Sequence, residues 1–125
     1  MQLVHRCVGE WVWRRLYRRL AALRVVVLDV DGVLTDGGLW YGPGGELVKR
    51  FDVRDGLGIR LLQHAGVEVA WLSGGRGGAT EVRAKHLGVG HCLVGAQDKP
   101  VALRRLQDQL AVPMATMAYV GEDRK

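Results

Sequence analysis

The residues best suited to chemistry in this 125-residue chain follow short apolar runs or open a predicted helix. They are Asp29, Asp31, Ser73, Gly74, Lys99, Glu122 and Asp123. Clustered carboxylates repel one another and need a cation, and an oxygen-only set without a convincing His or Cys group favours Mg²⁺. A carboxylate, a hydroxyl beside backbone N–H groups, a lysine and Mg²⁺ are the equipment of phosphoryl transfer, in which one carboxylate can be the nucleophile.

Alternating strand and helix patterns indicate how these residues can meet. Apolar runs predict strands at 25–30, 67–72, 91–94 and 117–120, and helical patterns predict helices at 58–64, 79–87 and 98–110. Two β-like stretches, 39–41 and 47–53, flank a Gly/Pro-rich turn and predict a β-hairpin. The predicted fold class is α/β: a Rossmann-like open parallel sheet with flanking helices and a hairpin insertion after the first strand. Ligands of such sheets bind outside the carboxyl ends of the strands.

The stretch Asp29-Val30-Asp31-Gly32, continued by Val-Leu-Thr35-Asp36-Gly37, resembles the first motif of the haloacid dehalogenase (HAD) superfamily of phosphatases. Ser73, Lys99 and the segment 121–123 occur in the order of the other three motifs. More narrowly, the hairpin, residues 51–59 and residues 97–99 resemble the capless 3-deoxy-D-manno-octulosonate 8-phosphate phosphatases and their nonulosonate 9-phosphate relatives. The resemblance implies an Mg²⁺-dependent phosphoric monoester hydrolase that acts on a 2-keto-3-deoxy sugar acid phosphate.

The resemblance also implies roles for individual residues. Asp29 attacks phosphorus and becomes an aspartyl-phosphate, while Asp31 protonates the leaving sugar alkoxide and later activates water. Ser73 and the Gly74 amide hold the phosphoryl oxygens. Lys99 pairs with Asp29 and with the phosphate.

A second group of residues is implied in binding. Arg54 and Thr35 are placed in the substrate and phosphate site, although Arg54 can equally be part of a structural turn. Asp29, the main-chain carbonyl of Asp31 and an acid from Glu122 and Asp123 are implied to hold Mg²⁺. Which of the last two acids binds the metal stays open.

The chain departs from the pattern of these phosphatases at three places. Relatives usually have Gly-Asp-Asp followed by a further Asp, whereas this chain has Gly121-Glu122-Asp123-Arg124-Lys125. Gly75 stands where many relatives have Arg. We expect the domain, residues 25–125, to lack the usual last strand and helix, which would leave the strand at 117–120 on an exposed edge. A non-catalytic protein that acts as an assembly partner is therefore an alternative interpretation.

The positive charge of the chain is concentrated at its N-terminus. Residues 1–24 contain six Arg and one Glu, so they carry the whole formal net charge of +5, and their apolar residues recur at helical spacing. We interpret this segment as an amphipathic basic helix with a solvated arginine face. Contact with a membrane surface or with nucleic acid is the less favoured interpretation.

The composition favours a single folded domain in the cytoplasm. Apolar residues make up 48% of the chain and charged residues 25%, which is close to the average of globular proteins. We find no apolar run long enough to span a membrane and no signal peptide. We expect a small sugar-phosphate substrate, no nucleic-acid partner and, by the resemblance, a homotetramer.

Overall fold

The computed structural model describes residues 14–15 and 18–121 of the chain. Within these residues, β1 (Val25–Asp29), β4 (Glu68–Leu72), β5 (His91–Leu93) and β6 (Met117–Val120) form one sheet in the order β5-β4-β1-β6. Every pair in it is parallel, and Val25 of β1 lies opposite Glu68 of β4 and Met117 of β6. The predicted α/β class with an open parallel sheet is confirmed.

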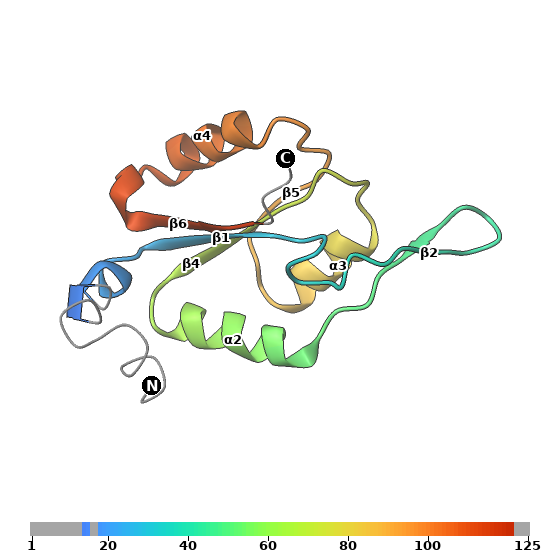
Figure 1. Cartoon of the computed structure of the whole chain (residues 1–125), viewed down its shortest axis with the longest axis horizontal. Helices are drawn as coiled ribbons and strands as arrows, with labels where there is room; N and C mark the ends of the chain where they lie inside the picture. Colours follow the sequence, from blue (N-terminus) through green and yellow to red (C-terminus); the bar gives the residue numbers. More distant parts are fainter. Residues whose placement is uncertain (1–13, 16–17, 122–125) are drawn as a thin grey trace.

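Helices cover both faces of this sheet (Figure 1). The side chains of β4 alternate between the faces, as in any strand. Val69 and Trp71 pack in one buried cluster with residues of α2 (Val53–His64) and α3 (Ala79–His86). Ala70 and Leu72 pack in a second cluster with Leu106 of α4 (Lys99–Leu110). The helices bury most of β1 and β4 and leave the carboxyl ends of the strands as the place for a site.

The predicted hairpin is present but shorter than expected. Its strands are β2 (Trp40–Tyr41) and β3 (Leu47–Val48), which pair antiparallel. Gly45 has φ +84° in the turn, a conformation that side chains other than glycine rarely adopt. The hairpin projects away from the body of the molecule (Figure 1). The expectation of a strand to residue 53 is wrong, because the chain leaves β3 after Val48 and turns back towards the sheet.

Helix α2 begins at Val53, so the predicted start at residue 58 is also wrong. Asp52 is its N-cap: Oδ1 accepts a hydrogen bond from the backbone N–H of Arg54 at 2.8 Å. The Arg54 guanidinium also bonds to the Asp52 carboxylate, and these hydrogen bonds lower the pKa of Asp52 to about 2. The cap therefore stays ionised across the whole physiological range.

The remaining elements follow the sequence prediction within about one residue. Helix α4 begins at Lys99, with the Asp98 carboxylate accepting from the Val101 N–H at 3.2 Å and Pro100 in the first turn, and β6 occupies the predicted residues 117–120. A 3₁₀ helix at Met114–Thr116 precedes β6 and was not predicted.

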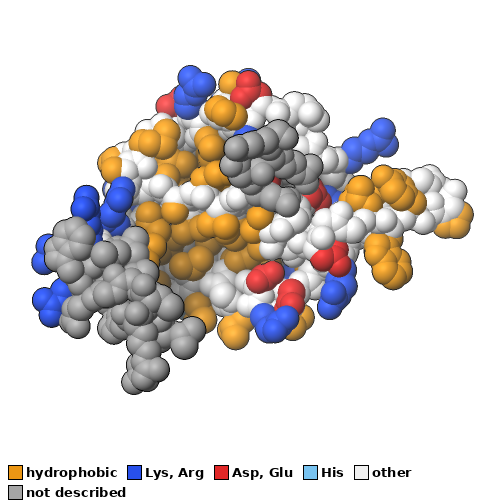
Figure 2. Space-filling model, viewed as in Figure 1, with side chains coloured by type: hydrophobic (Ala, Val, Ile, Leu, Met, Phe, Trp, Pro, Cys, Tyr) orange, Lys and Arg blue, Asp and Glu red, His pale blue; other side chains and the backbone are white. Residues whose placement is uncertain are grey.

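Only part of the proposed basic helix at 1–24 falls within the described residues. Residues 14–15 and 18–21 are helical. Figure 2 shows Lys and Arg side chains gathered at this end of the molecule, and Arg14, Arg15, Arg18 and Arg19 are exposed. Glu122 and Asp123 lie outside the described residues. Among the helices that the structure describes, none is long and apolar enough to span a bilayer.

Candidate active site

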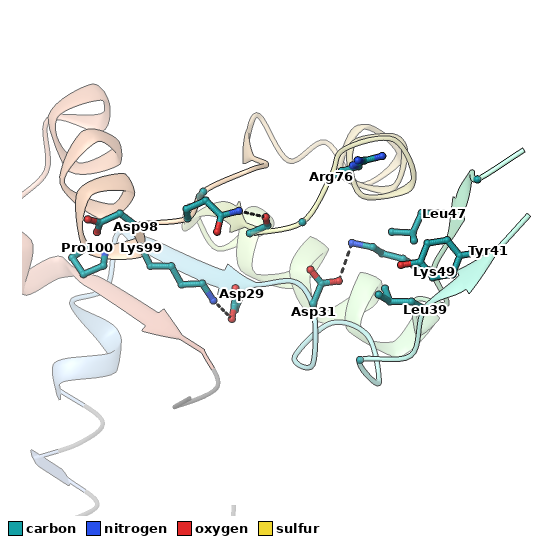
Figure 3. A pocket seen from close by; sticks show the side chains of 16 residues that line it. Asp29, Asp31, Leu39, Tyr41, Leu47, Lys49, Arg76, Asp98, Lys99 and Pro100 are labelled. Atoms are coloured by element: carbon teal, nitrogen blue, oxygen red, sulfur yellow. Dashed lines mark hydrogen bonds and ion pairs between the residues drawn. The ribbon is translucent and has the colours of Figure 1, made fainter. Parts of the chain in front are cut away.

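A pocket of about 1170 Å³ lies at the carboxyl edge of the sheet. It is lined by the ends of four segments: the loop after β1, the hairpin, the loop after β4 and the first turn of α4 (Figure 3). The predicted residues Asp29, Asp31, Gly74 and Lys99 all line it. The topology therefore gathers these residues as the sequence predicted.

Asp29 and Lys99 form an ion pair in this pocket. Asp29 ends β1 and is 4% exposed, and its Oδ2 lies 2.6 Å from Nζ of Lys99. Lys99 stands in the first turn of α4, which the Asp98 cap fixes beside the sheet edge. The hydrogen bond to Asp29 raises the pKa of Lys99, so the lysine is a cation and the carboxylate has a permanent counter-charge.

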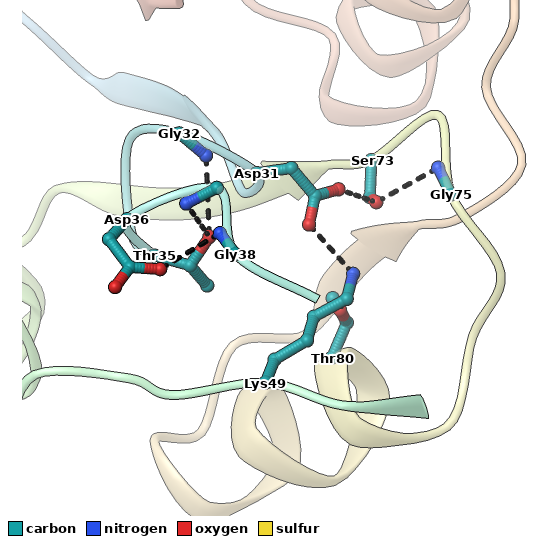
Figure 4. Close-up of polar contacts among 10 residues, drawn as sticks. Asp31, Gly32, Thr35, Asp36, Gly38, Lys49, Ser73, Gly75 and Thr80 are labelled. Atoms are coloured by element: carbon teal, nitrogen blue, oxygen red, sulfur yellow. Dashed lines mark hydrogen bonds and ion pairs between the residues drawn. The ribbon is translucent and has the colours of Figure 1, made fainter. Parts of the chain in front are cut away.

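Both carboxylate oxygens of Asp31 have partners (Figure 4). Oδ2 accepts a hydrogen bond from the Ser73 hydroxyl at 3.0 Å, and Oδ1 lies 2.8 Å from Nζ of Lys49. Asp31 is only partly buried, with a side chain 26% exposed, and it faces the pocket. The second candidate carboxylate is thus held by neighbours other than those of Asp29.

The loop after β4 brings a hydroxyl and backbone groups to the same place. Ser73 is 1% exposed, and its Oγ accepts from the N–H of Gly75 at 3.2 Å. The carbonyl of Gly74 accepts from the Gln97 side chain at 3.1 Å, which ties this loop to the segment before α4. A Cβ on Gly75 would lie 3.6 Å from both Asp31 Oδ2 and Ser73 Oγ, so a side chain at this position would start beside the two groups. Arg76, the next residue, lines the pocket.

Ser73, Thr35 and Arg54 are not among the residues that line the pocket. Thr35 is buried, and its Oγ1 accepts from the N–H groups of Gly32 and Gly37, so it shapes the loop after β1. The Arg54 side chain is 88% exposed and bonds to Asp52. Their implied contacts with substrate remain predictions.

Several lining residues were not among the predicted site residues, including the polar side chains of Tyr41, Lys49 and Gln97. Lys49 is the most consequential, because its side chain is 2% exposed and touches Asp31. The one signal for it is alternation: Leu47 and Lys49 are two residues apart and share a side of an extended chain. Nothing in the sequence indicates that this side faces Asp31.

The resemblance implies the Asp29 carboxylate and the Asp31 main-chain carbonyl as metal ligands. Both are oxygen ligands of the kind that Mg²⁺ prefers. Among the residues that the structure describes, no group of three His, Cys, Asp or Glu side chains could hold a metal by itself. Mg²⁺ usually keeps several waters and uses only one or two carboxylates, so this small set is compatible with it.

This sheet, with paired acids after its first strand and a lysine at the start of a later helix, has the architecture of the HAD superfamily. No family model matches the chain. A HAD superfamily hydrolase from Legionella pneumophila superposes with a TM-score of 0.84 and 33% identity, over 90% of this chain and 62% of that one. The predicted HAD-like fold is confirmed.

Within this superfamily the chain is related to the 3-deoxy-D-manno-octulosonate 8-phosphate phosphatases. The enzyme of that name from Escherichia coli K12, KdsC, is 42% identical over 101 residues, which are 81% of this chain and 54% of that one. The Moraxella catarrhalis phosphatase, solved with magnesium, phosphate and a KDO molecule, has a TM-score of 0.82 and 34% identity over 86% of this chain and 62% of that one. The resemblance seen in the motifs is confirmed, and the chain spans about half the length of the curated relatives it matches.

Proposed function

We propose that this chain is an Mg²⁺-dependent phosphatase of a 2-keto-3-deoxy sugar acid phosphate of the 3-deoxy-D-manno-octulosonate 8-phosphate type. One observation carries the proposal: the buried Asp29 carboxylate lies 2.6 Å from Lys99, on the rim where Asp31 and Ser73 also meet. A nucleophile, a second carboxylate, a phosphate-binding hydroxyl and a cation are together the parts that phosphoryl transfer needs. The relatives named above support the same class of reaction.

The reaction proceeds in two steps. An oxygen of Asp29 attacks phosphorus, the bond from phosphorus to the sugar oxygen breaks, and Asp31 gives its proton to the leaving alkoxide. Water then attacks the aspartyl-phosphate, Asp31 takes a proton from that water, and the bond from phosphorus to Asp29 breaks to release phosphate. Lys99 and Ser73 stabilise the negative charge on the phosphoryl oxygens.

A bound Mg²⁺ supplies further neutralisation of that charge. The Asp29 carboxylate, the Asp31 main-chain carbonyl and an acid from Glu122 and Asp123 would hold it. Mg²⁺ demands near-octahedral geometry, so the extra methylene of Glu122 relative to the usual Asp makes Asp123 the stronger candidate of the two.

The pocket suits an anionic sugar. Arg76 and Lys99 bring positive charge to it, and its volume of about 1170 Å³ is large enough for a small organic ligand, whose pockets are typically about 300–1,000 Å³. A nonulosonate 9-phosphate, which carries the same groups on a chain one carbon longer, is the alternative substrate. A non-catalytic assembly partner is not favoured, because four motif residues, Asp29, Asp31, Ser73 and Lys99, are assembled at one rim.

The proposal extends to the whole molecule through the resemblance. We place the chain in the cytoplasm as a homotetramer, with a basic helix at residues 1–24 ahead of the phosphatase domain at 25–125. We assign it no nucleic-acid partner.

Phosphate release from 3-deoxy-D-manno-octulosonate 8-phosphate, with Mg²⁺ and after its removal by EDTA, tests the proposal. We expect turnover that needs the metal and falls on the order of a thousandfold or more in Asp29→Asn, which removes the nucleophile while keeping the side-chain shape. Asp108→Asn, at an exposed position of α4, is the matched control and should retain full activity. Equal background release from the unaltered chain and from Asp29→Asn would remove the enzyme interpretation.

A further inference from the structure

Lys49 is a buried cation at the base of the hairpin. It follows β3 directly, and its side chain is 2% exposed. Burying an ammonium group is costly unless it is paired and hydrogen-bonded. Lys49 meets this condition with two partners: Asp31 Oδ1 at 2.8 Å and Thr80 Oγ1 at 3.2 Å. Thr80 is 0% exposed in the first turn of α3, so this helix supplies the second partner of the ammonium (Figure 4).

This contact makes the two oxygens of Asp31 different. Oδ1 faces Lys49, which can donate hydrogen bonds but cannot accept them. Oδ2 faces the Ser73 hydroxyl, a group that both donates and accepts. Oδ2 can therefore exchange Ser73 for a substrate oxygen, whereas Oδ1 remains anchored to the hairpin.

We propose that Lys49 is a positioning residue for the acid–base steps, because it anchors Asp31 Oδ1 and so aims Oδ2 at the leaving oxygen of the substrate. The inference rests on the proposed phosphatase function and adds to it a role for the hairpin. Two lysines then serve two carboxylates: Lys99 holds the nucleophile Asp29, and Lys49 orients Asp31. Misplacing a catalytic group by about 1 Å can cost on the order of a hundredfold in rate, so an anchor on Asp31 can matter as much as a group that binds the substrate.

The test compares two substrates that differ in their need for a proton. The alkoxide that leaves 3-deoxy-D-manno-octulosonate 8-phosphate must be protonated, whereas p-nitrophenolate leaves p-nitrophenyl phosphate as a stable anion. The value of kcat/KM reports only the steps up to loss of the leaving group, so later hydrolysis of the aspartyl-phosphate does not affect it. In Lys49→Met, we expect kcat/KM to fall about a hundredfold with the sugar phosphate and less than about threefold with p-nitrophenyl phosphate. Lys85→Met, at an exposed position of α3, should change neither value.

A second variant keeps the test valid if Lys49→Met folds poorly. In Asp31→Asn the proton donor is already lost, so adding Lys49→Met should cause no further loss of kcat/KM with the sugar phosphate. The double variant also removes both members of the buried pair, which avoids leaving one charge without a partner. Thermal unfolding followed by circular dichroism checks that each variant is folded.

The two proposals can fail separately. Equal losses with both substrates, or a further loss in the double variant, would show that Lys49 only supports the fold. An unaltered chain that hydrolyses neither substrate would contradict the phosphatase function, and the role of Lys49 would fall with it.

Discussion

Asp29 and Asp31 are two residues apart, yet their surroundings differ in kind. Asp29 is buried at the end of β1 with Lys99 as its counter-charge, whereas Asp31 is partly exposed between Lys49 and the Ser73 hydroxyl. A carboxylate paired with a lysine suits nucleophilic attack, and one hydrogen-bonded to a hydroxyl suits proton transfer. The difference comes from residues far along the chain: Lys99 is 70 positions from Asp29, and Ser73 is 42 from Asp31.

We expect Lys99→Met to lower phosphate release by a factor on the order of 10²–10³, because it removes a cation directed at the phosphoryl charge. Phosphate release with Lys85→Met as the control measures this effect. A variant that keeps activity within a few-fold would contradict the role of Lys99.

The hydrogen bond to Asp29 raises the pKa of Lys99 above the ordinary 10.5. The stability that the charge of Lys99 contributes through this ion pair is therefore complete up to pH 10.5 and is lost as the pH rises through the raised pKa.

Helix α2 shows how local sequence signals can conceal an element. Gly56 and Gly58 weaken the helical pattern, and Asp52 follows an apolar residue, so the segment resembles the end of a strand. In the structure Asp52 caps the helix, and Gly56 lies close to α3. A Cβ at Gly56 would meet Arg83 Nη2 at 2.7 Å and Leu87 Cδ2 at 3.2 Å, whereas one at Gly58 would meet nothing within 4 Å.

These surroundings predict different gains in stability from the same Gly→Ala substitution at the two positions. Gly58→Ala should raise the free energy of unfolding by about 1 kcal/mol, because alanine favours the helix and has room. Gly56→Ala gains the same helix propensity but must displace Arg83 and Leu87, so it should be less stable than Gly58→Ala. Urea unfolding of both variants at equal m-values measures the difference. Equal stabilisation by both would contradict the close packing of α2 against α3.

The sequence was sufficient for elements with clear boundaries. Strand β6 and the cap of α4 were predicted as they occur, because an apolar run and the Asp98-Lys99-Pro100 sequence are local signals. Lys49 could not be predicted, because its contacts with Asp31 and Thr80 depend on how the chain turns back towards the sheet after β3. Periodicity identifies the side of the hairpin on which a residue lies, but not what that side touches.

The whole molecule exposes apolar surface at the hairpin and at one edge of the sheet. Trp40 and Tyr41 are 70% and 69% exposed, and Figure 2 shows apolar side chains along the projecting hairpin. Among the described residues, β6 pairs on one side only, with β1. Large exposed apolar groups favour association between proteins, and this exposed surface therefore supports the proposal that the chain forms an oligomer.

We expect Trp40→Ser to weaken self-association without lowering the thermal stability of the individual subunit, because Trp40 is largely exposed. Sedimentation equilibrium of the unaltered chain and the variant measures this effect. Val82→Ser, which alters an exposed apolar residue of α3, is the control. If the chain is a monomer at every concentration, or Trp40→Ser leaves its association unchanged, the hairpin is not an interface.

Lys49 connects the hairpin to Asp31, the carboxylate that we propose transfers the proton. Because Lys49 directly follows β3, a tilt of the hairpin would move the Lys49 ammonium and change the orientation of the Asp31 side chain. A protein that binds the turn of the hairpin and shifts it would then change the rate of catalysis without entering the pocket.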